Sequence, residues 1–427
     1  MKLYEVKERL ASGELDTTLT ALYGSDKLTE AHSRYLEAID SFASLYGADR
    51  DVSLFSVAGR SEISGNHTDH NYGKVIAASI DLDIIAVASP SEGSIIRVKS
   101  EGFPEDTVDF SVYSAPVPEK YGSSESIIAG MVSGISAKGY KVGGFDAYTT
   151  SSVLKGSGLS SSAAFEDMIG TILSHLYNDG AIDNVLIAKL SQFAENEYFG
   201  KPCGLMDQVA CAAGGIVSID FEDPSAPVIE KLDFDITAAG YNLCIVNTGG
   251  NHADLTGDYA SVPAEMKSVA AHFGKNVLRR VSEEEIISAI PALRSKVGDR
   301  AVLRALHFIN ENKRVTAQVK ALKAGNVEEF FDGVIASGRS SFCYLQNVYT
   351  TKNVSEQGLS LALCLADGYL SGKSGAFRVH GGGFAGTIQA FVRTEDVEGF
   401  RKLMDSAFGE GACLILRVRR DGAIRII

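Results

Sequence analysis

A glycine- and serine-rich segment that leads into a helical pattern constrains this chain most. It reads Lys155-Gly156-Ser157-Gly158-Leu159-Ser160-Ser161-Ser162, and apolar residues follow at helical spacing (Ala163, Ala164, Met168, Ile169, Ile172, Leu173 and Leu176). A helix N-terminus has unpaired N–H groups and the positive end of the helix dipole, so it attracts phosphate. Glycines allow close approach, and serine hydroxyls can bind an anion or Mg²⁺. The segment therefore predicts a phosphate-binding loop, although a linker of small residues would look the same.

Composition indicates an ordinary globular protein with an acidic balance. The chain has 427 residues, of which 45% are hydrophobic and 22% charged, and its formal net charge is −14. This length can bury a large core and suggests two or three domains. Because there is no basic stripe, we expect no nucleic-acid partner. An acidic protein that handles an anionic ligand must gather positive charge or a metal ion locally.

The cysteines and the N-terminal residues point to the cytoplasm. Six cysteines are scattered without a CxxC pair, which argues against a zinc site or a disulfide framework. Four of the first eight residues are charged (Lys2, Glu5, Lys7 and Glu8), where a signal peptide would need an apolar core. No apolar stretch reaches membrane-spanning length, so we expect no membrane partner.

Hydrophobic periodicity predicts an α+β fold with two lobes. Helices are expected over 5–46 with polar breaks, 124–138, 163–176, 184–199, 301–324 and 327–337. Strands are expected over 52–58, 74–80, 84–88, 139–150, 215–221, 241–247, 376–380, 387–393 and 414–418. We place the boundary between the lobes after residue 217, giving domains 1–217 and 218–427. No internal repeat is present.

Polar groups crowd into residues 59–71, between two β-rich runs. Among them, Asn66, His67 and Asp69 offer both donors and acceptors, which suits a polyhydroxylated sugar. A metal site at His67 and His70 is disfavoured because no cysteine or glutamate lies at ligand spacing. A solvated loop without a ligand is the alternative.

Two further segments carry candidate chemistry. Asp207 follows Cys203-Gly204-Leu205-Met206 in apolar surroundings, where a carboxylate needs a cation such as Arg60 or a metal ion, unless it caps a helix. Glu195 lies at the end of the preceding helix. Later, Gly381-Gly382-Gly383 joins two predicted strands and contains more glycine than a tight turn needs, so we expect a close approach of backbone or ligand there.

These segments, in this order, resemble the three signature motifs of the GHMP small-molecule kinases, and the first resembles the galactokinase branch. The likeness runs from about residue 50 to 395 and includes Tyr259, which matches a sugar-contacting tyrosine. It implies a lobe like ribosomal protein S5 domain 2 followed by a ferredoxin-like lobe. It also implies ATP-dependent phosphorylation of a sugar at its anomeric hydroxyl, with galactose as the favoured acceptor. ATP, Mg²⁺ and a sugar are the expected ligands of a monomer.

The resemblance also implies roles for individual residues. Arg60 and Asp207 match the catalytic pair, while Ser161 and Glu195 match the metal ligands. The sugar pocket would be lined by Asn66, His67, Asp69, Gly204 and Tyr259. The nucleotide phosphates would be held by Gly156, Ser157, Gly158, Leu159, Ser160, Ser161 and Ser162.

Several residues depart from the family pattern. Asn66 replaces a sugar-contacting glutamate, Glu62 replaces an asparagine, His70 replaces a tyrosine and Ala385 replaces a glycine. These changes leave open the same chemistry on an arabinose, an N-acetylhexosamine or a uronic acid. A non-catalytic galactose and ATP sensor is a second alternative, which retention of the catalytic set disfavours. A dinucleotide-binding protein is a third, but no strand–GxGxxG–helix unit is present.

Overall fold

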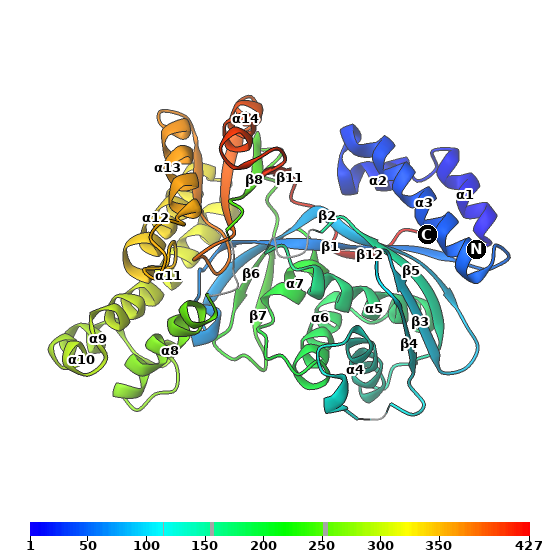
Figure 1. Cartoon of the computed structure of the whole chain (residues 1–427), viewed down its shortest axis with the longest axis horizontal. Helices are drawn as coiled ribbons and strands as arrows, with labels where there is room; N and C mark the ends of the chain where they lie inside the picture. The colour runs from blue at the N-terminus through cyan, green and yellow to red at the C-terminus, as the bar shows by residue number, and fades with distance from the viewer. Residues whose placement is uncertain (114, 154–157, 251–254) are drawn as a thin grey trace.

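The computed structural model describes residues 1–113, 115–153, 158–250 and 255–427, and its strands form two separate sheets. Figure 1 shows a larger lobe built on the first sheet and a second lobe that holds the smaller sheet and most of the later helices. This arrangement confirms the two-lobed α+β architecture predicted from the sequence.

The first sheet has eight strands and runs through the middle of the larger lobe. The order is β12-β1-β2-β5-β3-β4, with β6 beside β2 and β7 beside β6. β3 and β5 pair in parallel, whereas the other pairs are antiparallel. The bounds are β1 (Ser53–Ser64), β2 (Lys74–Pro90), β3 (Ile95–Ser100), β4 (Glu105–Asp109), β5 (Phe145–Ser151), β6 (Ile216–Asp220), β7 (Val228–Leu232) and β12 (Ala423–Arg425).

Helices cover both faces of this sheet, as Figure 1 shows. Successive side chains of a strand point to opposite faces, so Leu54 packs with the N-terminal helices while Phe55 packs with the helices on the other side. The N-terminal helices are α1 (Leu3–Ala11), α2 (Asp16–Tyr23) and α3 (Leu28–Tyr46). The opposite layer comprises α4 (Ser124–Ala137), α5 (Ser161–Tyr177), α6 (Asn184–Phe193) and α7 (Met206–Ala213).

The second sheet has four antiparallel strands in the order β11-β8-β10-β9. These strands are β8 (Tyr241–Asn247), β9 (Gly375–Val379), β10 (Thr387–Arg393) and β11 (Cys413–Leu416). The helices of this lobe are α8 (Thr256–His272), α9 (Glu283–Ser288), α10 (Ile290–Val297), α11 (Asp299–Lys323), α12 (Val327–Ser340), α13 (Gly358–Leu370) and α14 (Val397–Phe408). None of the helices in the described part of the chain has the length and apolar character needed to cross a membrane.

Several elements differ from the sequence prediction. β1 continues through the polar residues to Ser64, because contact with both lobes buries all twelve of its residues. The two runs expected at 74–80 and 84–88 form one strand, and the helix expected to reach residue 199 ends in a π-helical turn (Ala194–Tyr198). β12 returns to pair with β1. β6 runs across residue 217, so a division after 217 would cut this strand, and that division stays a prediction. We propose that β7 and β12 also belong to the first lobe.

A buried charge network joins the N-terminal helices and the C-terminal tail to the first sheet. Asp83 in β2 is fully buried and accepts hydrogen bonds from Tyr23 (2.5 Å), Arg34 (2.5 Å), Arg419 (3.0 Å) and Ser56. Burial alone would raise the pKa of Asp83, but the two guanidinium groups outweigh it and hold the pKa below its usual value. The carboxylate is therefore charged in the folded protein.

We expect Asp83→Asn to lower the free energy of unfolding by about 3–5 kcal/mol, because the change leaves buried guanidinium charge uncompensated. Urea unfolding at pH 7 measures the effect. Asp40→Asn, which removes an exposed pairing with Lys7, is the control and should cost less than about 1 kcal/mol. Since the folded-state pKa of Asp83 is lowered, the wild-type advantage should shrink as the pH falls below about 4. Equal stability of the two variants at pH 7 would contradict this role.

Candidate active site

Arg60 and Asp207 lie far apart in the sequence and form a two-pronged ion pair. Arg60 lies in β1 and Asp207 in the first turn of α7. Nε and Nη2 of Arg60 donate to Oδ1 and Oδ2 of Asp207, each at 2.8 Å. The planar guanidinium fork matches both carboxylate oxygens, which fixes the orientation of each side chain.

Asp207 is charged and open to solvent on one side. Withdrawal from water alone would raise its pKa, but Arg60 and the hydroxyl of Ser160 outweigh that effect and hold the pKa below its usual value. The side chain of Asp207 is 36% exposed, against 10% for Arg60. A ligand can therefore reach the carboxylate while the guanidinium stays buried.

The expected phosphate loop lies directly beside this pair. Ser160 has a left-handed backbone (φ 60°), and its hydroxyl donates to Oδ2 of Asp207 at 2.6 Å. The backbone N–H of Arg60 donates to the carbonyl of Leu159 at 3.0 Å, and Nη1 donates to that of Gly158. α5 then begins at Ser161, without a side-chain cap among the described residues, so its first N–H groups can bind an anion. Of the residues predicted here, Gly156 and Ser157 lie outside the described part.

Two buried carboxylates adjoin the loop. Glu166 in α5 and Glu195 in the π-helical turn each accept a hydrogen bond from the amide nitrogen of Gln208, at 3.1 and 3.0 Å. Burial, and then the charge of Glu195, raises the pKa of Glu166 to about 8. Lys201 is the nearby cation, with its ammonium 2.9 Å from Oε1 of Glu195. At neutral pH Glu166 is therefore mostly protonated, Lys201 balances the charge of Glu195, and a cation bound beside them would favour ionisation of Glu166.

The side chain of Asn66 is fully buried and hydrogen-bonded to other residues of the protein. Its amide nitrogen donates to Oε1 of Glu62 (3.1 Å) and to the carbonyl of Gly381 (2.6 Å). Its amide oxygen accepts from Ser341 (3.1 Å) and Asn347 (2.8 Å). An amide offers two donor hydrogens and two acceptor lone pairs, so all four positions are used.

His67 is held as a neutral ring at the end of a chain of polar contacts. Its Nε2 donates to the carbonyl of Gly382 at 2.8 Å, and burial lowers its pKa to about 3. Nδ1 must then accept from Nε2 of His70, 3.2 Å away. That nitrogen also lies 3.4 Å from Oδ1 of Asp69. The carboxylate of Asp69 reaches Gly204, where a Cβ atom would lie 3.2 Å from Oδ2.

Helix α11 of the second lobe contacts the loop that contains Gly65 and Asn66. Glu311 accepts from the N–H of Gly65 at 3.2 Å, and Nε2 of His307 donates to the carbonyl of Asn66 at 3.0 Å. Burial alone would raise the pKa of Glu311, but Arg314 and other nearby charges lower it to about 2. The loop conformation therefore depends on packing between the lobes.

The triple-glycine segment closes against Tyr259 and Asn347. The hydroxyl of Tyr259 donates to the carbonyl of Gly383 at 2.7 Å, and its ring packs edge-on against Phe384. A Cβ at Gly383 would lie 1.9 Å from the carbonyl oxygen of Asn347, which only glycine avoids. Close backbone approach thus accounts for glycine at this position.

Two cavities meet at the phosphate loop. The smaller, about 140 Å³, is lined by Asp69, Ser162, Glu195, Lys201, Cys203, Gly204, Met206, Asp207 and Gln208. The larger, about 770 Å³, shares Ser162, Glu195 and Lys201 with it and extends between β3, β5, α4 and α5. The catalytic candidate Asp207 and the sugar-binding candidates Asp69 and Gly204 therefore face the small cavity, while the large one has room for a nucleotide.

The sequence prediction missed several residues around this site. Glu166 had a usable signal, because it lies four positions after Ser162 on one helix and shares its face. Lys201, Glu311 and Arg378 carried no local signal, since their partners come from other elements.

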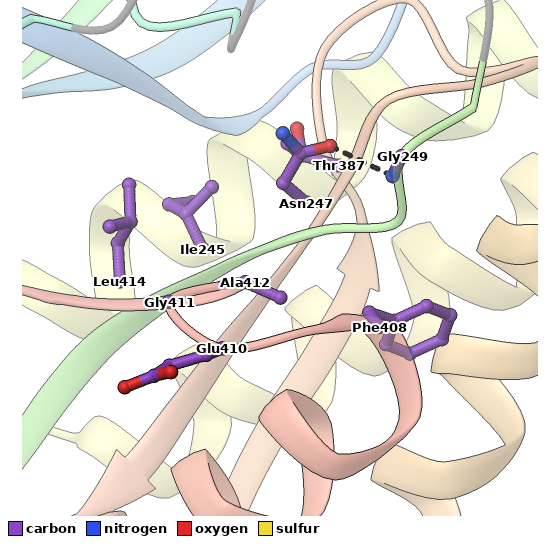
Figure 2. Close-up of a pocket in the computed structure, with 9 residues that line it drawn as sticks. All are labelled: Ile245, Asn247, Gly249, Thr387, Phe408, Glu410, Gly411, Ala412 and Leu414. Carbon is purple, nitrogen blue, oxygen red and sulfur yellow. Dashed lines mark hydrogen bonds between the residues drawn. The ribbon is translucent and has the colours of Figure 1, made fainter.

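A further hollow lies between the ends of β8, β10 and β11 and is drawn in Figure 2. Among the described residues that line it, Glu410 is the only ionisable one, and its carboxylate points away from Asn247 and Gly249. This hollow therefore lacks convergent charged groups and is a poor candidate for catalysis.

Comparisons with known proteins agree with this geometry. The family description "GHMP kinases N terminal domain" matches residues 126–215, and "Galactokinase galactose-binding signature" matches residues 40–90. Among solved structures, a Lactococcus lactis galactokinase complexed with galactose aligns over 92% of this chain and all of its own, with a TM-score of 0.74 and 24% identity. A mevalonate kinase aligns over 86% of this chain with a TM-score of 0.62 and 14% identity. These two structures share the fold.

Closer relatives identify the family. The galactokinase of Glaesserella parasuis is 34% identical over 370 residues, which cover 85% of this chain and 91% of that protein. The galactokinase of Streptomyces coelicolor is 30% identical over 385 residues, covering 89% and 94%. With similarity along nearly the full length of these proteins, the chain belongs to the galactokinase family of GHMP kinases.

Proposed function

We propose that this protein transfers the γ-phosphoryl group of ATP to the anomeric hydroxyl of a sugar, with galactose as its best acceptor. The observation that carries the proposal is the Arg60–Asp207 pair, which adjoins the open N-terminus of α5 and faces the small cavity. A buried guanidinium, an ionised acid and an anion-binding helix end together suit phosphoryl transfer, which asks mainly for positioning and charge neutralisation.

The large cavity is the proposed nucleotide site. Its lining includes the aromatic residues Phe103, Phe165 and Phe199, which suit a flat base, and it leads to Ser161 and Ser162. The phosphates would then lie over the first turn of α5, held by its N–H groups and by the loop from Gly158 onward.

Mg²⁺ fits the acidic cluster beside this loop. The described residues contain no group of three or more His, Cys, Asp or Glu side chains placed to hold a metal ion. One or two carboxylates completed by phosphate oxygens are typical of Mg²⁺, so Glu195 and the hydroxyl of Ser161 would hold it. When bound, the ion would neutralise charge on the phosphates. The raised pKa of Glu166 is consistent with a cluster that lacks positive charge.

Asp207 acts mainly by orienting the acceptor hydroxyl. A carboxylate whose pKa is held low is a weak base, so full proton removal before transfer is unfavourable. In a loose transition state the hydroxyl proton leaves late, which fits a residue that aligns and then accepts it. Good alignment alone accounts for roughly 7–11 kcal/mol of barrier reduction in well-oriented systems.

Galactose is the proposed acceptor because the relatives and the aligned sugar complex are galactokinases. Asp69 and Gly204 line the small cavity, and His67 and Tyr259 each donate a hydrogen bond to the glycine loop. We also propose that the protein works as a monomer in the cytoplasm.

A panel of free sugars with ATP and Mg²⁺ tests the function. We expect galactose to give the highest kcat/KM when compared with arabinose, N-acetylgalactosamine and galacturonic acid, in an assay that detects ADP. Removal of Mg²⁺ with EDTA should abolish turnover. Faster turnover of another sugar at equal concentration would overturn the preference for galactose. Binding of ATP and sugar without ATP consumption would instead indicate a sensor.

We expect Asp207→Ala to reduce kcat by about 10²- to 10⁴-fold while ADP affinity changes less than about threefold, because Asp207 contacts the acceptor hydroxyl rather than the nucleotide. Calorimetric titration with ADP and steady-state kinetics measure the two effects. Asp207→Asn keeps a hydrogen-bonding group opposite Arg60 and serves as the control for folding. Turnover above a tenth of the wild-type rate in both variants would remove Asp207 from the catalytic role.

A further inference from the structure

We infer that Glu62 supplies the carboxylate that recognises a hydroxyl of the sugar, at the end of the ring away from the phosphorylated position. The inference rests on the proposed function and names a specificity-determining residue within it. Asn66, which the sequence pattern placed in this role, has no free hydrogen-bonding position left among its described contacts.

One carboxylate oxygen of Glu62 accepts hydrogen bonds from the described part of the protein, and the other does not. Oε1 accepts from Nη2 of Arg378 at 2.8 Å and from the amide of Asn66 at 3.1 Å. Oε2 has no hydrogen-bond partner among the described residues, and it is not one of their fully enclosed unpaired atoms. The side chain is only 8% exposed, so that small exposed area includes an acceptor that a ligand can reach.

The strand geometry places Glu62 on the catalytic side of the sheet. Arg60 pairs with Ser79 and Glu62 pairs with Ala77 in regular antiparallel register, so both side chains leave β1 on the same face. That face carries α7, since Ser79 donates to the carbonyl of Ala210 in α7. Two residues span roughly 6–7 Å along a strand, a separation comparable with the width of a sugar ring.

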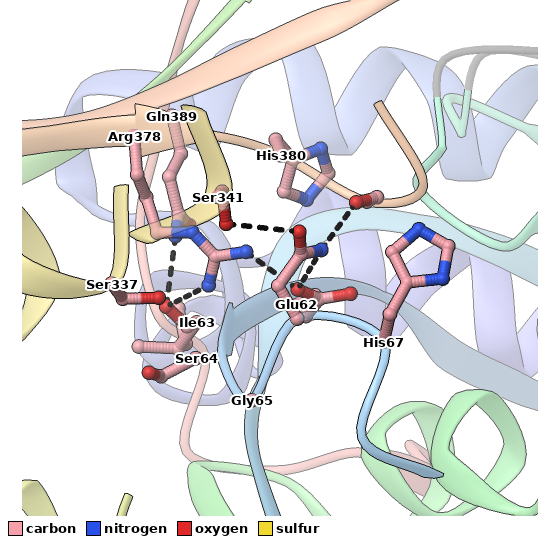
Figure 3. A network of polar contacts seen from close by, with 12 residues as sticks. Glu62, Ile63, Ser64, Gly65, His67, Ser337, Ser341, Arg378, His380 and Gln389 are labelled. Atoms are coloured by element: carbon pink, nitrogen blue, oxygen red, sulfur yellow. Dashed lines mark hydrogen bonds and ion pairs between the residues drawn. The ribbon is translucent and has the colours of Figure 1, made fainter. Parts of the chain in front are cut away.

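Figure 3 shows the two oxygens of Glu62 turned in different directions, one toward Arg378 and the other toward the side on which His67 lies. His67 itself is tied to the glycine loop through the carbonyl of Gly382. The free oxygen therefore points to the same side as His67, and we expect a sugar bound at Asp207 to extend toward it.

The chemistry of this oxygen restricts the substrate class. A carboxylate accepts hydrogen bonds and carries negative charge, so it favours a hydroxyl and repels a carboxylate at the same place. Arg378 fixes Glu62 from behind with its buried guanidinium, which also donates to the carbonyl of Ile63 at 3.1 Å. The pocket is thus set for a neutral sugar, which disfavours a uronic acid.

Kinetics with 2-, 3-, 4- and 6-deoxygalactose test the inference. For the wild type, we expect one of these sugars to lose about 10-fold or more in kcat/KM, as the loss of a hydrogen bond to a charged group implies. In Glu62→Gln, kcat/KM for galactose itself should fall by a similar factor. The difference in kcat/KM between galactose and that one deoxy sugar should then shrink below about threefold. The kcat/KM for galacturonic acid should rise relative to that for galactose. The KM for ATP should stay within about twofold.

Two further variants control for structural effects. Glu62→Leu with Arg378→Met removes the buried pair together and should give the same pattern if the single variant fails to fold. Asn66→Ala should lower kcat/KM for all these sugars by one common factor, because Asn66 only positions the loop.

Several outcomes would overturn the inference. One is an unchanged pattern of losses across the deoxy sugars in every Glu62 variant. Another is a loss in Asn66→Ala that is selective for one hydroxyl. If the wild type phosphorylates none of these sugars, the proposed function fails, and this inference fails with it.

Discussion

The bidentate contact between Arg60 and Asp207 is the interaction on which the rest of the site depends. It joins β1 to the start of α7, and through Gly158, Leu159 and Ser160 it also joins both to the phosphate loop. Each group alone would be costly in this largely buried place, whereas together they compensate each other's charge. The pair therefore positions three segments at once and leaves one side of Asp207 open to the acceptor.

The distribution of charge around this pair explains how an acidic protein can bind an anionic nucleotide. The net charge of −14 is unfavourable at long range, yet Arg60, Lys201 and the dipole of α5 converge on one small region. The ionised carboxylate of Glu195 would oppose a phosphate on its own. We propose that a divalent cation held by Glu195 would reverse that sign, which would make the acidic cluster part of the nucleotide site rather than an obstacle to it.

The sequence predicted elements that depend on local residue patterns, and it missed contacts that form by packing between the lobes. The strands at 241–247 and 387–393 were predicted at their observed bounds, because they are unbroken β-prone runs between turn residues. β12 has only three residues, too few for any periodicity, and forms because the chain returns to the edge of β1. Arg60 and Asp207 were predicted as neighbours because an isolated buried aspartate needs a cation, and the structure brings them together. The contacts of Glu311 with Gly65 and of Arg378 with Glu62 could not be predicted, since each joins residues of different lobes.

The same dependence on packing changes the meaning of two departures from the family pattern. Glu62 and Asn66 look like independent substitutions in the sequence, yet they contact each other. Glu62 also pairs with Arg378, and Asn66 also donates to the carbonyl of Gly381. An amide at 66 can satisfy donors and acceptors from both lobes, which a carboxylate could not, since it would face the carbonyl of Gly381 without a hydrogen to donate. The carboxylate at 62 in turn finds a buried guanidinium that an asparagine would leave uncompensated. Changing either residue alone would leave an unpaired polar group, so we infer that the two positions are coupled, with Asn66 positioning the loop and Glu62 facing the sugar.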